Sequence, residues 1–223
     1  MNYSIGIGIT TTPNRSNYFR QCLDNMMLHT ENVCKLYTHV DEFGKGVAYS
    51  KNECLYNLRD CDFIFLFDDD CWPIMKGWET DLIKAHITSG EKHFLFLDER
   101  THGKRKPIGV GYSSFENCGG VFMSFDNRNV LIENEVGYMD YEYKRWGFEH
   151  AGYSQRIYRA NLTSSPYIMP NFLPSYLYAV DYDPQIKAVS SLTNEEKSAN
   201  FEHNRQIFVS ECTNSPIYKP YRK

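Results

Sequence analysis

A run of five apolar residues that ends abruptly in three aspartates constrains the fold more than any other feature of this sequence. The run is Phe63-Ile64-Phe65-Leu66-Phe67, and Asp68-Asp69-Asp70 follow it directly. An uninterrupted apolar strand is typical of a parallel sheet with both faces covered by helices. Ligands of such sheets bind at the carboxyl ends of the strands, so the aspartates are expected at the functional edge.

The segments around this strand alternate between extended and helical patterns. Strands are expected at 5–9, Cys34–Val40, 63–67 and His93–Leu97. Helices are expected at 16–29 and Ala48–Leu58, and a third helix is expected to end at about Ser89. Ser16 is the expected N-cap of the first helix. This order predicts an α/β sheet with right-handed crossovers.

Beyond residue 98 the alternation is less regular. Strands are expected at Gly109–Ser114 and 119–125, and helices at Phe148–Ala160 and Thr193–Glu211, the last capped by Thr193 or Asn194. Tyr167–Ala179 is expected to be extended and broken by prolines. No change of composition marks a linker, so residues 1–223 are expected to form one domain with two lobes.

Composition excludes several classes of protein. The net charge of −4 gives no global attraction to nucleic acid or anionic lipid, and the local basic run 102–106 is read as a solvated loop or an anion contact. The apolar runs are shorter than the roughly 18 residues that span a bilayer, and no basic segment precedes an apolar one at the start. Seven irregularly spaced cysteines indicate free thiols. A soluble, cytoplasmic protein is therefore expected.

The three aspartates predict a metal site. Adjacent carboxylates repel one another unless a positive charge offsets them, and Mg²⁺ or Mn²⁺ binds one or two carboxylates together with phosphate oxygens. Residues two apart in an extended segment point the same way, so Asp68 and Asp70 are expected to share one ion while Asp69 points elsewhere. The alternative is an acidic loop that caps the next helix.

Four segments in order resemble the GT-A glycosyltransferases, especially glycosyltransferase family 2. They are the first strand with Thr10–Arg15, the stretch Gly46–Asn52, the strand and aspartates up to Pro73, and Trp146-Gly147-Phe148-Glu149-His150. The resemblance covers roughly residues 3–160. It implies a Rossmann-like nucleotide-sugar-binding sheet, with 1–98 as the nucleotide-binding half and 99–223 as the acceptor half.

The resemblance also implies roles for individual residues. Thr10, Arg15 and Asp41 match positions that recognise the nucleotide, although Asp41 is also read as a simple turn residue. Lys51 would pair with the diphosphate, Asp69 would lie at the donor site, and Gly119 and Gly120 would let the backbone approach the donor sugar. Asp68 and Asp70 would hold the metal, with His203 as the candidate third ligand.

The catalytic base is less clear from the resemblance. Inverting members of the family use a carboxylate to accept the proton of the acceptor hydroxyl. This sequence has His150 at that position, so Glu149 or His150 is the expected base, with Asp140 as a further candidate for the acceptor site. The alternatives are that His150 binds the metal, or that Glu149 only stabilises the start of a helix.

The expected function is metal-dependent, inverting transfer of a sugar from a nucleotide-sugar, with UDP as the expected nucleotide, to an acceptor hydroxyl. The acceptor would be a saccharide or glycoconjugate, or a hydroxymethylated base of phage DNA. The alternatives are a nucleotidyltransferase, a non-catalytic nucleotide-sugar-binding protein, and a glycan-binding module. The sequence does not determine the sugar or the oligomeric state.

Overall fold

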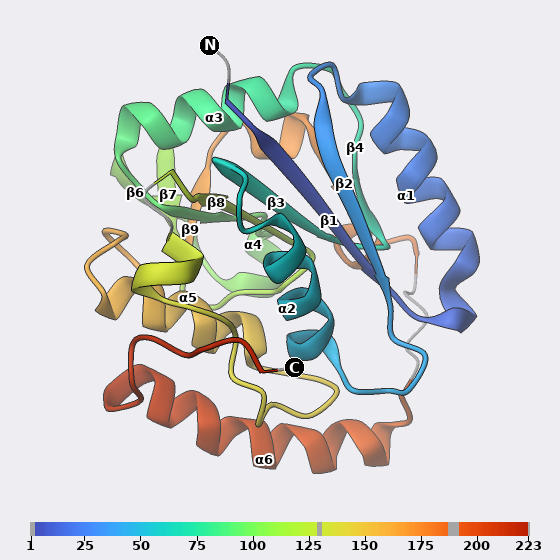
Figure 1. Ribbon diagram of the computed structural model, residues 1–223, viewed down its shortest axis with the longest axis vertical. Coiled ribbons are helices and arrows are strands. Elements are labelled where there is room, and N and C mark those ends of the chain that lie inside the picture. The colour runs from blue at the N-terminus through green and yellow to red at the C-terminus, as the bar shows by residue number, and fades with distance from the viewer. Residues whose placement is uncertain (1–2, 129–130, 187–191, 223) are drawn as a thin grey trace.

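The computed structural model describes residues 3–128, 131–186 and 192–222 (Figure 1). Its strands are β1 (Ile5–Thr11), β2 (Cys34–Val40), β3 (Phe63–Asp68), β4 (Cys71–Pro73), β5 (His93–Leu95), β6 (Lys106–Gly109), β7 (Tyr112–Ser114), β8 (Phe122–Asp126), β9 (Ile168–Pro170) and β10 (Leu177–Ala179). Its α-helices are α1 (Ser16–His29), α2 (Val47–Leu58), α3 (Trp78–Ser89), α4 (Glu99–His102), α5 (Glu149–Arg159) and α6 (Asn194–Thr213).

The central sheet is mixed, with the strand order β2-β1-β3-β8-β5. β1 pairs in parallel with both β2 and β3, whereas β8 runs antiparallel between β3 and β5. The predicted α/β class is confirmed. The strand expected at 93–97 does not join β3 directly, because β8 arrives from 27 residues further along the chain and occupies the place between them.

Helices cover both faces of this sheet, as the apolar strand predicts. On one face, the ring of Trp78 on α3 lies 5.0 Å from that of Phe65 and 5.4 Å from that of Phe67. On the other face, α2 lies directly on β1, where a Cβ at Gly8 would come within 2.8 Å of Cys54 Cβ. Glycine in this strand therefore permits the close approach of α2. All five residues from Phe63 to Phe67 are fully buried.

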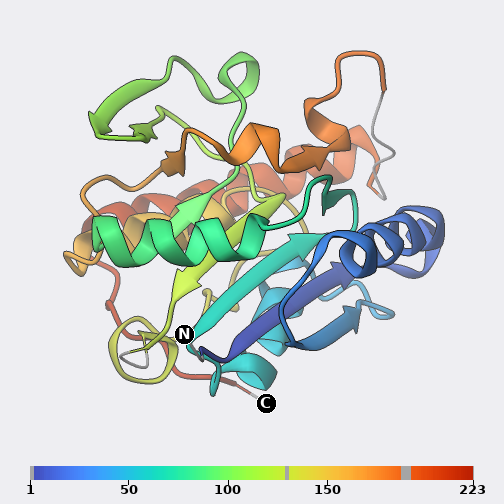
Figure 2. The same ribbon diagram turned by 90° about the horizontal axis from the view of Figure 1, so that it is seen from above.

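Two smaller sheets and a helical layer complete the fold. β4 pairs with β10, and β6, β7 and β9 form a three-stranded sheet whose β6–β7 hairpin stands away from the centre (Figure 2). The strand expected at Gly109–Ser114 is in fact one arm and the turn of this hairpin, because Gly111 takes the left-handed backbone that reverses the chain. α6 runs along the lower side and packs on α5 (Figure 1).

Local capping agrees with the sequence at one helix and differs at another. Thr193 caps α6 in a capping box with Glu196, as predicted. The prediction of Ser16 as N-cap of α1 is wrong, since Ser16 is already helical and follows directly on the turn Pro13–Arg15. Among the described helices, none has the length and hydrophobicity required to cross a membrane.

Candidate functional site

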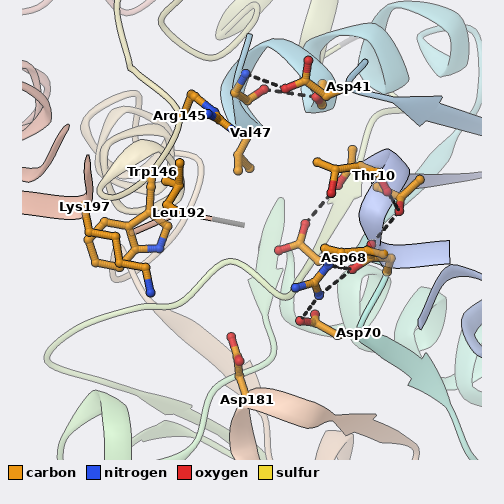
Figure 3. Close-up of a pocket in the computed structure, with 16 residues that line it drawn as sticks. Thr10, Asp41, Val47, Asp68, Asp70, Arg145, Trp146, Asp181, Leu192 and Lys197 are labelled. Carbon is orange, nitrogen blue, oxygen red and sulfur yellow. Dashed lines mark hydrogen bonds and ion pairs between the residues drawn. The ribbon is translucent and has the colours of Figure 1, made fainter. Parts of the chain in front are cut away.

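The aspartates lie where β1 and β3 end side by side. The parallel register places Thr10 opposite Asp68, and the Thr10 hydroxyl donates to Asp68 Oδ1 at 3.0 Å. One residue further, the Thr11 hydroxyl donates to Asp69 Oδ2 at 2.6 Å. The first loop and the carboxylates therefore form one wall of a cleft of about 350 Å³, within the range of small-ligand sites (Figure 3).

Two cations offset part of the negative charge on this wall. Lys51 is fully buried, and its Nζ lies 2.7 Å from Asp68 Oδ1. Burial disfavours the charged form of Asp68, but Lys51, His150 and the Thr10 hydroxyl together outweigh it and hold the pKa of this carboxyl below its ordinary value. Arg15 binds both oxygens of Asp69, with Nε–O distances of 2.8 and 3.0 Å, and also pairs with Asp70.

The side chains of Asp69 and Asp70 do not follow the alternation of a strand, because both residues lie in a turn after β3. Asp69 points to Thr11 and Arg15, and Asp70 meets the same guanidinium. All three aspartates consequently line the cleft. Asp70 Oδ1 is buried and has no hydrogen-bond partner among the described residues.

A fourth carboxylate, Asp181, faces these three from the single-turn helix Val180–Tyr182 (Figure 3). The chain reaches this place because β10 pairs with β4, and the Val180 amide donates to the Asp70 carbonyl at 2.9 Å. Burial and the charge of Asp68 raise the pKa of Asp70 to about 7, and both also raise the pKa of Asp181. The cleft thus holds more negative charge than Lys51 and Arg15 offset.

The donor set fits a hard divalent cation that is completed by ligand oxygens. Carboxylate oxygens are the ligands that Mg²⁺ and Mn²⁺ prefer. In residues 3–128, 131–186 and 192–222, no three histidine, cysteine or acidic side chains are close enough to enclose an ion. The protein therefore offers a partial coordination shell, which phosphate oxygens of a bound ligand would complete.

The wall opposite the aspartates is built from two other segments. Arg145 and Trp146 precede α5, Leu192 precedes α6, and Lys197 lies in the first turn of α6. The Lys197 ammonium lies 5.5 Å from the ring centre of Trp146. Asp41 lies at the far end of the cleft, where its oxygens accept the amides of Lys45 and Gly46 at 2.9 and 2.8 Å (Figure 3). Asp41 therefore fixes the loop to which it belongs.

Glu149 and His150 form a buried pair at the start of α5. Glu149 Oε1 lies 3.2 Å from His150 Nδ1, while Glu149 Oε2 and His150 Nε2 have no hydrogen-bond partner among the described residues. The pair adjoins the aspartates through Gly120: a Cβ there would lie 1.8 Å from His150 Nδ1, and the next carbonyl, of Val121, accepts the Asp68 amide at 2.9 Å. A Cβ at Gly119 would lie 2.7 Å from His102 Nε2.

Two predicted site residues lie elsewhere. Asp140 is ion-paired with Lys219 and is not among the residues that line the cleft. His203 is on α6, also outside the cleft lining, and its Nε2 lies 3.0 Å from the carbonyl oxygen of Glu142. The structure therefore brings together Thr10, Arg15, Asp41, Asp68, Asp69 and Asp70 around the cleft, with Lys51, Gly120 and the Glu149–His150 pair directly behind it.

Sequence reasoning missed three charged residues of the cleft: Arg145, Asp181 and Lys197. Each lies in or beside a segment without a regular apolar pattern, and none belongs to a motif that carries chemistry by itself. Only the long-range pairing of β10 with β4 and of α6 with α5 places Asp181 and Lys197 here.

Comparison with solved structures identifies the architecture. The chain is similar to GalNAc-T7 solved with UDP, GalNAc and Mn²⁺, with 8% identity, a TM-score of 0.57, and coverage of 92% of this chain and 48% of the other. It is also similar to residues 1–349 of S. aureus TarS, with 12% identity, a TM-score of 0.57, and coverage of 95% and 66%.

The fold is therefore the GT-A glycosyltransferase fold, and this chain spans about half of the GalNAc-T7 chain and 66% of the TarS chain. No protein-family model matches the sequence, and no curated protein matches it.

Proposed function

We propose that this chain is a divalent-metal-dependent glycosyltransferase that moves a sugar from a nucleoside-diphosphate donor to an acceptor hydroxyl. The observation that carries the proposal is the excess of carboxylate charge at the carboxyl ends of β1 and β3. Asp68, Asp69, Asp70 and Asp181 meet there, and the pKa of Asp70 is raised to about 7. The same fold holds UDP, GalNAc and Mn²⁺ in GalNAc-T7, which supports this interpretation.

Asp68 and Asp70 would hold the metal as part of its coordination shell, and Asp181 would add negative charge beside it. A bound Mg²⁺ or Mn²⁺ supplies Lewis-acid stabilisation of the charge that develops on a departing diphosphate. Lys51 and Arg15 orient the carboxylates through their ion pairs. Thr10 and Asp41 bound the end of the cleft where the nucleoside would lie.

Glu149 and His150 would act together on the acceptor. With the Glu149 carboxylate at Nδ1, the neutral imidazole carries its proton there and leaves a lone pair on Nε2. His150 would accept the proton of the acceptor hydroxyl at Nε2, while Glu149 stabilises the imidazolium that results. A base that activates the hydroxyl for direct attack on the sugar is consistent with inversion of its anomeric configuration. We therefore propose an inverting transfer.

A saccharide or glycoconjugate is the acceptor we propose. The half-exposed indole of Trp146 in the cleft wall offers a flat apolar face of the kind that sugars stack on. The DNA alternative relied on the basic run 102–106, where Arg105 and Lys106 form ion pairs with Glu99 and Glu116 at 3.2 and 3.3 Å. These pairs offset the charge that a phosphate contact would need.

The test is calorimetric titration with UDP, GDP, ADP, CDP and dTDP, in Mn²⁺ and in EDTA. We expect one of them to bind at micromolar concentration in Mn²⁺ only, and Asp70→Asn to abolish that binding. Asp24→Asn, an exposed change on α1, is the matched control. The proposal fails if no nucleotide binds, or if binding is indifferent to both EDTA and Asp70→Asn.

Product analysis then separates transfer from nucleotidyl chemistry. With the matching nucleotide-sugar and a panel of saccharides, a glycosyltransferase releases nucleoside diphosphate, whereas a nucleotidyltransferase forms or consumes pyrophosphate. His150→Ala should keep donor binding and lose transfer. If it loses both equally, the base assignment is wrong.

A further inference from the structure

The two walls of the cleft carry opposite charge, and the proposed metal site accounts for only one of them. The aspartates and Asp181 line one side, while Arg145 and Lys197 line the other, on either side of Trp146 (Figure 3). Both cations were absent from the sequence predictions, and neither takes part in the metal or base roles above.

Arg145 is held in place but not neutralised. Its guanidinium lies over the loop that follows β2, where a Cβ at Gly44 would be 3.3 Å from Cζ and a Cβ at Gly46 would be 2.9 Å from the Arg145 Cα. Both glycines have a positive φ, which glycine adopts readily. Within the described part of the chain, Arg145 forms no ion pair or hydrogen bond.

Lys197 lies on the same wall of the cleft. Its ammonium lies over the indole of Trp146, 5.5 Å from the ring centre. It forms no ion pair with the described residues, in contrast to Lys51 and Arg15, which are bound to the aspartates. Arg145 and Lys197 therefore line the cleft as two cations that form no ion pair with the described residues.

A buried polar anchor fixes the segment that carries Arg145 and Trp146. Asn204 on α6 is fully buried; its Oδ1 accepts the Lys144 amide at 2.8 Å, and its Nδ2 donates to the carbonyls of Trp146 and Gly147, both at 2.9 Å. The same helix supplies Lys197. The basic wall is therefore a preorganised surface, with both cations positioned by α6.

We infer that Arg145 and Lys197 bind the two phosphates of the nucleoside diphosphate donor from the side opposite the metal. This inference rests on the proposed function. Lys51 and Arg15 offset two of the four carboxylates at the metal end, and a divalent cation offsets the other two. The two ionised phosphates of the donor then match Arg145 and Lys197, whereas a nucleoside monophosphate donor would leave one cation unpaired in a partly dry cleft.

The experiment compares three probes with the same base: the nucleoside diphosphate that binds the wild type best, its monophosphate and its nucleoside. Calorimetry in Mn²⁺ is applied to Arg145→Gln, Lys197→Gln and the double variant. Lys144→Gln and Arg205→Gln are the controls, since one is the exposed neighbour of Arg145 and the other an exposed cation on the same helix as Lys197.

Each single variant is expected to bind the diphosphate about tenfold more weakly, equivalent to about 1.4 kcal/mol, and the double variant about a hundredfold more weakly. Monophosphate binding should fall less, and nucleoside binding should not change. Thermal unfolding by circular dichroism confirms that each variant is folded.

The outcomes separate the two proposals. If the double variant binds the diphosphate as the wild type does while Asp70→Asn does not bind it, the inference is overturned and the proposed function stands. Equal weakening of all three probes would also overturn it, since the cations would then only shape the cleft. If the wild type binds no nucleoside diphosphate, the proposed function falls and this inference with it.

Discussion

Replacing Lys51 with methionine would remove a buried charge while keeping the shape of the side chain. Lys51 Nζ lies 2.7 Å from Asp68 Oδ1; the lysine side chain has 0% exposure and the aspartate 27%. Breaking a fully buried ion pair costs about 3–5 kcal/mol, because the remaining charge loses its compensation. Water reaches part of Asp68, so we expect Lys51→Met to lower the free energy of unfolding by about 2 kcal/mol at pH 7.

The assay is urea unfolding, followed by circular dichroism, in EDTA. With a denaturant dependence of about 2 kcal/mol per molar urea, the unfolding midpoint should fall by about 1 M. Lys84→Met is the control: Lys84 pairs with Asp81 at 3.0 Å on the surface, where both side chains are exposed, so its midpoint should barely move. Mn²⁺ should restore much of the lost stability in Lys51→Met, since the ion replaces the missing charge.

The pH dependence gives a second check with a fixed sign. The folded-state pKa of Asp68 is lowered, so its pair contributes stability above the ordinary carboxyl pKa of about 4 and loses it as the pH falls through the folded value. The difference between wild type and Lys51→Met should therefore be fully present at pH 7 and narrow as the pH falls below about 4. Equal midpoints at pH 7, or a difference that does not depend on pH, would refute the reasoning.

Three further variants test how the site is held together. Gly120→Ala should abolish sugar transfer but spare nucleotide binding, because its Cβ would lie 1.8 Å from His150 Nδ1 and displace the ring; transfer at the wild-type rate would contradict this. Asp140→Asn should leave KM and kcat nearly unchanged and cost about 1 kcal/mol of stability, since Asp140 pairs with the C-terminal segment, and a large loss of kcat would return it to the catalytic site. Asn204→Ala should cost about 2 kcal/mol in urea unfolding and weaken diphosphate binding, because the segment 144–147 loses its anchor; unchanged diphosphate affinity would argue against a preorganised wall.

The first half of the fold was predictable because its signals are local. The strand β2 has the predicted bounds, α1 begins at Ser16, the residue expected to cap it, and α2 begins one residue earlier than expected. The aspartates were placed at the ends of the strands because a buried apolar run cannot continue into three carboxylates. Once β1 and β3 pair in parallel, their register places Thr10 opposite Asp68, and no contact outside the sheet is needed.

The second half was harder because its decisive contacts are long-range. Asp140 looks like a site carboxylate in sequence, yet Lys219 is 79 residues away and only the folded chain brings them together. Asp181 reaches the cleft through the pairing of β10 with β4, whose strands are three residues each. Strands of three residues carry no periodicity from which their pairing could be predicted.

The histidine that we propose as the base, in place of a carboxylate, has a physical reason beside this cleft. A carboxylate at position 150 would add a charge of the same sign beside Asp68 and Glu149, and its pKa would be raised by both. Imidazole is neutral before it accepts the proton and cationic afterwards, and the cation is stabilised by Glu149 at 3.2 Å and by the field of Asp68. Replacement by aspartate, the residue of the resembled family, should therefore not preserve activity here: His150→Asp should bind the nucleotide in Mn²⁺ and transfer sugar more slowly than wild type. Full activity in His150→Asp would show that the carboxylate cluster does not control the choice of base.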